Sequence, residues 1–281
     1  MQLREALISA TERLTMAGSA DSRRDAELLL MFTLGRDRSF LYSHPERSLT
    51  NEESAQYDDA LGKRSRGMPP QYITGHQEFW GMDFVVSPAV LIPRPETEHL
   101  VETVLELAQA TERPRIVDVG TGSGCIALAL AKELRHAEIH AVDISPAALE
   151  VARSNATRHG LEDGVRFQDS DLLGAFSQDV ARFDFVVSNP PYVSETERDS
   201  LQREVRDFEP PLALFAGANG LGVIDRLILQ AEAALKPGGW LMMEIGKGQE
   251  EFLRQRLTGW GKVRFRNDLQ QIPRVVAAQK R

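Results

Sequence analysis

The chain has 281 residues, of which 42% are hydrophobic, and its 33 basic and 41 acidic side chains give a net charge of −8. This length predicts one large or two modest domains with a sizeable core. The acidic balance argues against a tight non-specific grip on nucleic acid, and the single cysteine, Cys125, excludes an internal disulfide framework and a cysteine-rich metal site.

Residues 1–70 have the pattern of a small helical domain. Apolar residues recur twice at helical spacing, Asp21 or Ser22 can cap the second helix, and Gly35 can end it. The first helix carries charged residues, and no apolar run in the chain is long enough to cross a bilayer, so we expect neither a signal peptide nor an anchor. The protein is therefore expected to be cytoplasmic. A helical module before a catalytic domain would help to select the substrate.

Residues 71–95 predict a β-hairpin that links this region to the rest of the chain. Strand-like sequence over residues 72–86 turns near Gly81, and the X-Pro pairs that follow cannot lie inside a helix. A helix is expected to begin near Glu96. Arg94 and Glu96 fit either an ordinary surface pair or two groups that close over an active site, and the residues alone favour neither interpretation.

The next segment predicts a nucleotide-binding turn. A strand over residues 115–119 leads into Gly120-Thr121-Gly122-Ser123-Gly124 and a helix of small and apolar residues, and a second strand ends in Asp143. Glycines at alternate positions allow the backbone to turn tightly and approach a ligand closely. An acid at the end of the second strand can accept both ribose hydroxyls of an adenosine. The spacing is G-x-G-x-G, not the G-x-G-x-x-G of dinucleotide enzymes, which favours S-adenosylmethionine over NAD.

The third strand is expected over residues 165–167. Two residues that follow it, Asp171 and Leu172, are candidates for contact with an adenine. Asp171 can accept a hydrogen bond from the adenine amino group, and Leu172 can pack on the ring, although either residue also fits a plain turn. Cys125 lies where a helix begins, a position that can stabilise a thiolate, but a small packing residue is the favoured interpretation.

The most informative stretch is Asn189-Pro190-Pro191-Tyr192, which follows an apolar strand over residues 183–188. Ligands of open α/β sheets bind outside the carboxyl ends of the strands, so this loop is expected to project into a site. The side-chain carbonyl of Asn189 and the backbone carbonyl of Pro190 suit a planar –NH2 group with two donors, as in an amide or an aminopurine. Tyr192 can cover the flat face of that group. A Pro-Pro turn with an Asn cap is the alternative.

The remainder of the chain predicts the second half of an α/β domain. Residues 194–220 are polar and irregular and form a candidate lid or partner-contact loop. The other expected elements are a helix over 222–235, a turn over 236–239, a strand over 240–245, a helix over 252–257, and a final hairpin of strands over 263–265 and 275–278.

Together these stretches resemble one known family across nearly the whole chain, the bacterial release factor glutamine methyltransferases of the HemK/PrmC type. The resemblance is carried by residues 72–80, 91–98, 118–131, 141–145, 187–193, 208–210 and 244–246. The Asn-Pro-Pro-Tyr motif is shared with adenine-N6 DNA methyltransferases, whereas Ile73-Thr74-Gly75 and residues 92–98 look like this family's own. One departure is Gln270, which replaces a glycine often seen near the C-terminus.

The resemblance implies an α/β fold. It consists of a class I S-adenosylmethionine-dependent methyltransferase domain with a Rossmann-like seven-stranded sheet, an N-terminal helical-bundle domain and a linking β-hairpin. The implied domains are residues 1–70 for substrate recognition, 71–95 for the hairpin linker and 96–281 for the methyltransferase.

The resemblance also implies a reaction and its partners. A monomer without a metal would transfer a methyl group from S-adenosylmethionine to the side-chain N5 of the glutamine in the Gly-Gly-Gln motif of peptide chain release factors 1 and 2. S-adenosylhomocysteine would be the product, and neither nucleic acid nor a membrane would be bound directly. The implied cofactor-binding residues are Gly120, Thr121, Gly122, Ser123, Gly124, Asp143, Asp171, Leu172 and Asn189. The implied substrate-binding residues are Asn189, Pro190, Pro191 and Tyr192, of which Asn189, Pro190 and Tyr192 are catalytic.

Three other functions fit parts of the pattern. A nucleic-acid adenine methyltransferase shares the Asn-Pro-Pro-Tyr loop, but the acidic charge and the lack of a basic stripe oppose it. A glutamine methyltransferase acting on a ribosomal protein would use the same amide chemistry. A non-catalytic module that binds S-adenosylmethionine would not need an intact loop from Asn189 to Tyr192.

Overall fold

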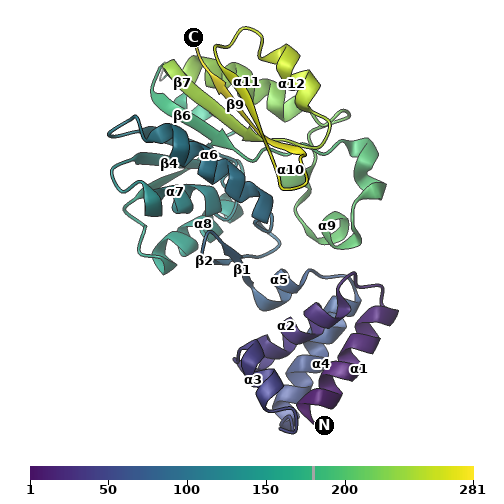
Figure 1. The fold of residues 1–281 in the computed structure, drawn as a ribbon. Helices are drawn as coiled ribbons and strands as arrows, with labels where there is room; N and C mark the ends of the chain where they lie inside the picture. The colour runs from purple at the N-terminus through teal and green to yellow at the C-terminus, as the bar shows by residue number, and fades with distance from the viewer. Residues whose placement is uncertain (179–180) are drawn as a thin grey trace. The chain divides into compact units, whose positions relative to one another are not determined.

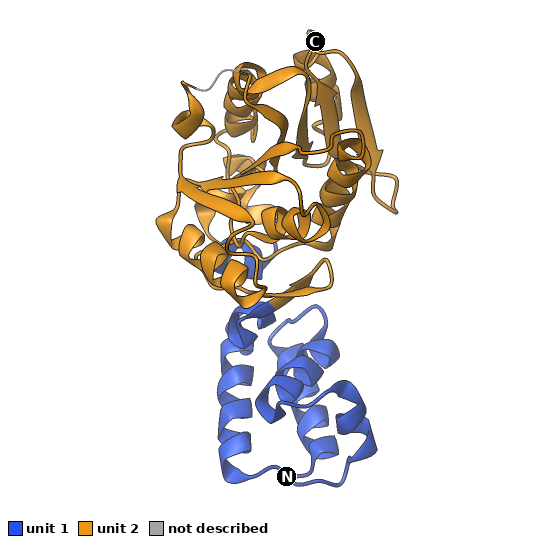
Figure 2. Ribbon diagram, turned by 90° about the vertical axis from the view of Figure 1, so that its left-hand side faces the viewer, with its two compact units in different colours: residues 1–76, 202–208 blue, residues 77–201, 209–281 orange. Residues whose placement is uncertain are grey.

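The computed structural model describes residues 1–178 and 181–281 (Figure 1). Their contacts divide the chain into two compact units, one of residues 1–76 with 202–208 and one of residues 77–201 with 209–281 (Figure 2). A short segment from the second half of the chain therefore belongs with the N-terminal helices. The three-part division at residues 70 and 95 stays a prediction.

The smaller unit is helical and has a core of its own. It contains α1 (Leu3–Met16), α2 (Ser22–Leu34), α3 (Arg38–Ser43), α4 (Asn51–Ser65), α5 (Pro70–Thr74) and α9 (Arg203–Phe208). Leu14, Leu29 and Tyr57 are buried together in this core. The side chain of Asp21 caps α2, and Gly35 ends it with a φ of 59°, so the predicted ends of this helix are confirmed.

A buried cation fixes the segment 202–208 to the N-terminal helices. Arg64 Nε lies 2.7 Å from Asp25 Oδ2, and Arg64 Nη1 lies 2.6 Å from Glu204 Oε2. Only 7% of the Arg64 side chain is exposed, and a guanidinium removed from water needs such partners to offset its lost hydration. Because Glu204 lies on α9, this ion pair joins α9 to α2 and α4.

The predicted hairpin is shorter than expected. Its strands are β1 (His76–Phe79) and β2 (Met82–Val85), and the turn has positive φ at Trp80 (54°) and Gly81 (63°). The turn near Gly81 is confirmed, and it has the left-handed backbone that two-residue hairpins require. The strand predicted over residues 72–75 is wrong, because Pro70 starts a short helix there and Gly75 ends it with a φ of 78°.

The larger unit is built on a seven-stranded sheet with the order β5-β4-β3-β6-β7-β9-β8. The strands are β3 (Arg115–Val119), β4 (Glu138–Asp143), β5 (Val165–Asp169), β6 (Phe183–Ser188), β7 (Leu235–Glu244), β8 (Val263–Asn267) and β9 (Pro273–Gln279). The first five are parallel, and β9 is antiparallel to β7 and β8. The chain leaves β3 towards β4 on one side and returns to β6 on the other, which makes the carboxyl ends of β3 and β6 the expected ligand crevice.

Alternating side chains of the strands face two separate cores. Ile116, Phe185 and Met242 belong to one apolar cluster, whereas their neighbours in the chain, such as Val117 and Val186, belong to the other. The first face is covered by α6 (Glu98–Ala108), α7 (Cys125–Glu133) and α8 (Pro146–Arg158), and the second by α11 (Gly222–Ala234) and α12 (Glu250–Arg256) (Figure 1). The predicted fold class is confirmed.

Two segments differ from the expectations in detail. The predicted turn over 236–239 lies within β7, where the pairing with β6 shifts between Leu235 and Trp240, so these residues interrupt the ladder without ending the strand. The segment 194–220, predicted to be irregular, contains the short helices η3 (Glu195–Ser200), α9 and α10 (Pro211–Leu214). Two more 3₁₀ turns are η1 (Pro95–Thr97) and η2 (Gly174–Phe176).

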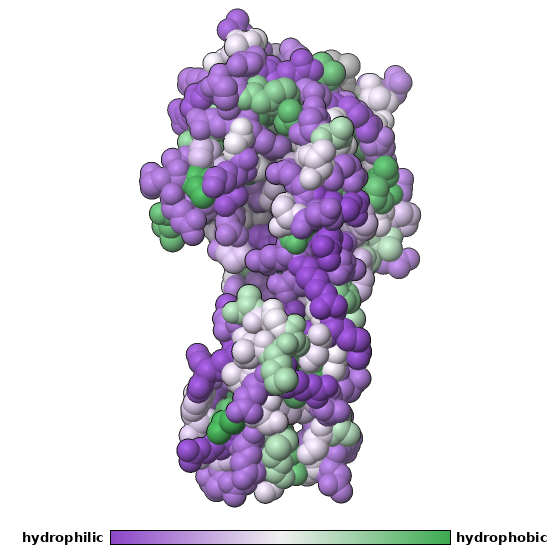
Figure 3. Space-filling model, turned by 90° about the vertical axis from the view of Figure 1, so that its right-hand side faces the viewer, coloured by the Kyte–Doolittle hydropathy of each residue, from purple (hydrophilic) through white to green (hydrophobic). Residues whose placement is uncertain are grey.

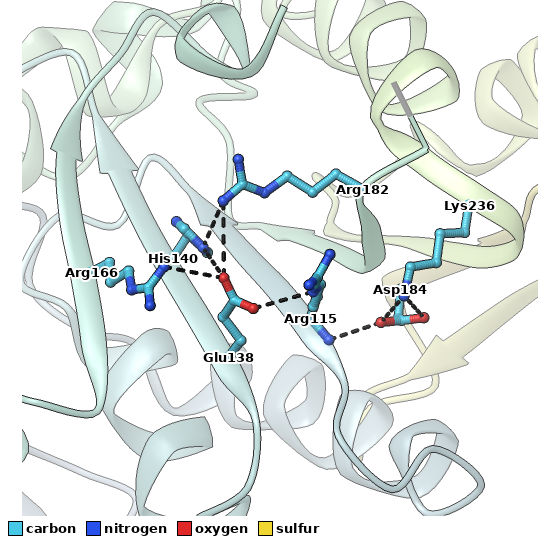
Figure 4. Close-up of polar contacts among 7 residues, drawn as sticks. All are labelled: Arg115, Glu138, His140, Arg166, Arg182, Asp184 and Lys236. Atoms are coloured by element: carbon cyan, nitrogen blue, oxygen red, sulfur yellow. Dashed lines mark hydrogen bonds and ion pairs between the residues drawn. The ribbon is translucent and has the colours of Figure 1, made fainter. Parts of the chain in front are cut away.

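The amino ends of the parallel strands carry a cluster of paired charges (Figure 4). Glu138 lies within 3.0 Å of His140, 3.2 Å of Arg115 and 3.3 Å of Arg166. Beside this cluster, Lys236 Nζ lies 2.8 Å from Asp184. The pairs of Glu138 with Arg115 and Arg166, and of Asp184 with Lys236, join neighbouring strands and hold them together at their amino ends.

The visible surface is mostly hydrophilic. On the face drawn in Figure 3, hydrophobic residues occur in small scattered groups between polar ones. Among the described residues, no helix combines the length and the apolar character that crossing a membrane would require.

Candidate active site

The glycine turn after β3 is shaped by backbone geometry that other residues rarely adopt. Gly120, Gly122 and Gly124 have φ values of 72°, 56° and 83°. A Cβ on Gly124 would come within 3.2 Å of Ala152 on α8, so this glycine also allows close helix packing. A Cβ on Gly120 or Gly122 would meet nothing within 4 Å, and both residues line an open cavity. The turn therefore presents bare backbone to whatever occupies that cavity.

Two buried polar side chains hold this turn from behind. Asn155 on α8 donates to Ser123 O (2.9 Å) and exchanges hydrogen bonds with the backbone of Val85, which ties the turn to the hairpin. Asp118 accepts from Thr121 Oγ1 at 2.6 Å. Burial raises the pKa of the Asp118 carboxyl to about 7. Both groups are withdrawn from solvent, so they position the turn.

Asp143 ends β4 beside the turn, as the sequence predicted. Its Oδ2 accepts from Gly122 N and its Oδ1 from Ser145 N, both at 2.9 Å. Burial raises the pKa of this carboxyl, and the backbone N–H groups oppose that effect. Each carboxylate oxygen retains acceptor capacity, so Asp143 can receive two ligand hydroxyls while the backbone fixes its orientation.

A cavity of about 300 Å³ opens at the carboxyl ends of the strands. Of the residues predicted from the sequence, those that line it are Gly120, Thr121, Gly122, Ser123, Asp143, Asp171, Leu172, Asn189 and Pro191. Gly124, Pro190 and Tyr192 do not line it. The two predicted motifs thus meet at one cavity, although they lie far apart in the sequence.

Asn189 follows β6 at the rim of this cavity. The end of its strand is fixed by Ser188, whose Oγ donates to Val119 O at 2.7 Å. Asn189 Nδ2 donates to Thr97 Oγ1 at 3.1 Å. Within residues 1–178 and 181–281, nothing donates to Asn189 Oδ1, so the side-chain carbonyl is a free acceptor beside the cavity.

The loop after Asn189 is clamped from two sides. Val193 exchanges backbone hydrogen bonds with Leu214 O (2.9 Å) and Ala216 N (3.0 Å). Gln249 Nε2 donates to Tyr192 O at 3.2 Å, and a Cβ on Gly220 would come within 2.4 Å of the same oxygen. Burial raises the pKa of Tyr192, so its hydroxyl remains neutral. A loop held in this way can keep Asn189 in one place.

The two residues predicted to contact an adenine differ in character. Asp171 lines the cavity, but its side chain is 53% exposed and its Oδ2 accepts from Arg226 Nη2 at 2.6 Å. Leu172 has a φ of 52° and packs partly against the second core. Both line the cavity, and a contact with an adenine stays a prediction for each.

Two further residues at the site, Thr97 and Glu244, were not among the predicted ones. Thr97 lines the cavity, and so does Arg94, which the sequence left open between a surface pair and an active-site role and which forms an ion pair with the buried Glu209. Glu244 ends β7 and is 3% exposed. A signal for Glu244 was available, because a carboxylate that ends an otherwise apolar strand is unusual unless it has buried partners. Thr97 gave no such signal.

Cys125 behaves as a packing residue. It is buried at the start of α7, and burial raises the pKa of its thiol to about 12. The thiol is therefore neutral near pH ~7, and the thiolate alternative finds no support in its surroundings.

Both the N-terminal part and the following part of the chain match known protein families. The family described as "PrmC N-terminal domain" matches residues 5–75, and the family described as "Methyltransferase small domain" matches residues 96–206. The structure also resembles solved methyltransferases at low identity. The hMettl16 catalytic domain has a TM-score of 0.58 at 20% identity and covers 78% of this chain and 81% of its own. A 16S rRNA methyltransferase of T. thermophilus has a TM-score of 0.53 at 21% identity and covers 73% and 50%. These likenesses support the fold.

Relatives of much higher identity match the whole chain. A release factor glutamine methyltransferase of Koribacter versatilis is 52% identical over 280 residues, which is 100% of this chain and 99% of the relative. One of Clostridium acetobutylicum is 38% identical over 99% of this chain and 98% of the relative. With both family domains present in order and relatives matched from end to end, the chain belongs to the family of release factor glutamine methyltransferases.

Proposed function

We propose that this enzyme, an S-adenosylmethionine-dependent methyltransferase, methylates the side-chain N5 of the glutamine in the Gly-Gly-Gln motif of peptide chain release factors 1 and 2. The observation that carries the proposal is the free side-chain carbonyl of Asn189 at the rim of the cavity. A primary amide presents two N–H donors, so an acceptor without a protein donor suits it.

The cavity fits the cofactor by the chemistry of its lining. The bare backbone at Gly120 and Gly122 leaves room for a close approach, and Asp143 offers two oriented acceptors for ribose hydroxyls. The volume of about 300 Å³ is in the range of small-molecule sites. When bound, the cofactor supplies a methyl group activated by a sulfonium. Asp171 and Leu172 are proposed to contact the adenine.

The protein's contribution to the reaction is to hold the amide. Amide nitrogens are poor nucleophiles because their lone pair is delocalised. Asn189 Oδ1 and the carbonyl of Pro190 would accept the two N–H groups, which fixes the –NH2 and favours positive charge that develops on it. Pro191 and Tyr192 would enclose the flat amide. Positioning of this kind can account for about 7–11 kcal/mol of barrier reduction at best.

The partner is proposed to be a protein. A net charge of −8 disfavours binding to a polyanion, because each phosphate contact needs a cation to neutralise it. The helical unit, which matches the PrmC N-terminal domain, would select the release factor. We propose that a monomer acts in the cytoplasm, where release factors meet the ribosome.

The direct test is methyl transfer from labelled S-adenosylmethionine. Purified release factor 1, release factor 2, ribosomal proteins and a DNA duplex serve as substrates in parallel, and mass spectrometry of peptides locates the label. We expect label only in the release factors and only on the glutamine of Gly-Gly-Gln. A release factor in which that glutamine is replaced by alanine is the control and should take up none.

Each other outcome points to a different function. Label in a ribosomal protein would identify a sister glutamine methyltransferase, and label in DNA would identify an adenine methyltransferase. Binding of S-adenosylhomocysteine without transfer to any of these substrates would indicate a binding module. Any of the three results, without labelled release factor, would overturn the proposal.

A further inference from the structure

A chain of hydrogen bonds continues from Asn189 into the core of the sheet. Asn189 Nδ2 donates to Thr97 Oγ1 at 3.1 Å, and Thr97 Oγ1 donates to Glu244 Oε2 at 2.6 Å. The hydroxyl of Tyr192 lies 3.5 Å from the other oxygen of Glu244, at the outer limit of a hydrogen bond. Thr97 and Glu244 are 2% and 3% exposed, so water does not compete for these contacts.

The direction of this chain is set by the carboxylate. A threonine hydroxyl has one proton, and a carboxylate can only accept, so the Thr97 proton must point to Glu244. Thr97 Oγ1 can then only accept from Asn189, and it receives the –NH2 end of that amide. The carbonyl end of Asn189 is left free at the cavity.

On the basis of the proposed function, we propose that Thr97 and Glu244 are positioning residues that hold the carbonyl of Asn189 towards the substrate amide. Neither group touches the reacting atoms in this account. Without them, the Asn189 amide can rotate by half a turn about its terminal bond and present –NH2 to the substrate –NH2. Two donors would then face each other, and the substrate amide would lose one of its two acceptors.

The protonation state of Glu244 makes the arrangement sensitive to pH. Burial raises the pKa of Glu244 to about 7, and Thr97 opposes this shift by its hydrogen bond. The charged groups that act on Glu244 are Glu96, which raises the pKa, and Arg274 and Arg94, which lower it. A protonated Glu244 can donate to Thr97, whose own proton then turns towards Asn189 and favours the reversed amide. Loss of the Glu244 charge should therefore lower turnover.

The first test compares matched threonine variants. Thr97→Val removes the hydroxyl at nearly constant volume, and Thr97→Ser keeps it. Thr103→Val is the control, because Thr103 is a buried threonine of helix α6, which directly follows Thr97, and its hydroxyl donates to the backbone oxygen of His99 (2.7 Å). We expect kcat of Thr97→Val to fall by about 10- to 100-fold, with KM for the release factor changed by less than about threefold. Thr97→Ser should restore most of that loss, and Thr103→Val should match the wild type.

The second test uses the pH profile of kcat. With a pKa of about 7, the ionised fraction of Glu244 falls about tenfold between about pH 8 and about pH 6, and wild-type kcat should fall with it. Glu244→Gln can still accept from Thr97 but cannot ionise. Its kcat should be lower than the wild-type value at about pH 8 but should lack this step.

A third readout needs no substrate. The side-chain amide protons of Asn189, assigned in ¹⁵N NMR spectra by their absence in Asn189→Ala, should shift with pH in the free wild-type protein. In Glu244→Gln they should not shift over the same range. This measurement reports on the network even if release factors prove not to be the substrate, so failure of the inference and failure of the proposed function can be told apart.

Three results would overturn the inference. These are a Thr97→Val variant with wild-type kcat, a loss of kcat in Thr97→Val that Thr97→Ser does not reverse, and Asn189 amide protons that titrate equally with and without Glu244.

Discussion

The amino ends and the carboxyl ends of the strands in the seven-stranded sheet carry acidic side chains whose pKa values are shifted in opposite directions. At the amino ends, Glu138 is surrounded by His140 and three arginines, and the hydrogen bond from His140 lowers its pKa (Figure 4). At the carboxyl ends, Asp118 and Glu244 are buried, and burial raises the pKa of each to about 7. The sheet is the same, but Glu138 at the amino ends is paired with cations, whereas Asp118 and Glu244 at the carboxyl ends accept hydrogen bonds from the hydroxyls of Thr121 and Thr97.

This difference separates structural from functional polar groups. Charges with partners on neighbouring strands cost the fold little and help to align the strands. A buried carboxyl with a raised pKa destabilises the folded state near neutral pH, so it persists where something else depends on it. The carboxyl ends of the strands are also where the cavity opens and where Asn189 keeps a free acceptor.

The largest expected effect is the loss of turnover in Asn189→Ala. Removal of the acceptor should lower kcat by about 10²- to 10³-fold, as loss of one oriented polar group in an active site does. The affinity for S-adenosylhomocysteine, measured by calorimetry, should fall by less than about fivefold, because Asp143 and the glycine turn remain. Asn267→Ala, an exposed change at the end of β8, is the control. Turnover close to the wild-type rate would refute the role of Asn189.

The next effect is the pH dependence of stability, to which Glu244 at the carboxyl ends of the strands and Glu138 at the amino ends should contribute with opposite signs. The folded pKa of Glu244 is about 7 against an ordinary value of 4.5, so the unfolded chain releases this proton first as the pH rises. The carboxyl therefore reduces stability progressively between about pH 4.5 and about pH 7, by roughly 3 kcal/mol in all. Glu138 has a lowered pKa, so the stability that it contributes is present above about pH 4.5 and is lost as the pH falls.

Urea unfolding across this pH range measures both effects. Glu244→Gln should gain stability relative to the wild type as the pH rises, and Glu138→Gln should lose it. Curves for Glu244→Gln and the wild type that run parallel from about pH 4.5 to about pH 8 would show that Glu244 ionises normally in the fold.

A smaller effect is expected for the acids that line the cavity. Asp143→Ala should weaken S-adenosylhomocysteine binding by about 10- to 100-fold, because two charge-assisted hydrogen bonds to the ligand are lost. Asp171→Ala should weaken it by less than about fivefold, because Asp171 is half exposed and paired with Arg226. The reverse order of the two effects, in calorimetric titrations, would mean that the ribose does not bind at Asp143.

The smallest effect should follow changes at the amino ends of the strands. Glu138→Gln should reduce the free energy of unfolding near pH ~7 by about 1 kcal/mol or less, because its partners are partly exposed. Its kcat and KM should equal those of the wild type. A clear loss of kcat without a loss of stability would contradict a purely structural role for the charges at the amino ends of the strands.

Local sequence patterns were sufficient for much of this architecture. The strand that leads into Gly120 and the helix that starts at Cys125 follow from a buried apolar run, a glycine turn and small residues, all within about twenty neighbours along the chain. The ends of α2 follow in the same way from Asp21 and Gly35. The position of Asn189 follows from the rule that parallel strands deliver ligand groups at their carboxyl ends.

Contacts between distant segments could not be predicted in this way. Thr97 and Glu244 are 147 positions apart, and nothing in either neighbourhood indicates the other. The ion pair that attaches α9 to the N-terminal helices joins Arg64 and Glu204, and residues 202–208 alone resemble an exposed helix. The short helix at Pro70 was missed because aromatic and β-branched residues there favoured a strand, while the proline and Gly75 decided the outcome.

The most direct test of the central claim is a crystal structure of the enzyme with S-adenosylhomocysteine and a release factor that carries an unmodified Gly-Gly-Gln loop. We expect the glutamine –NH2 to lie within hydrogen-bond distance of Asn189 Oδ1, with Asn189 Nδ2 still donating to Thr97 Oγ1. A glutamine bound elsewhere, or an Asn189 amide turned with Nδ2 towards the glutamine, would contradict it.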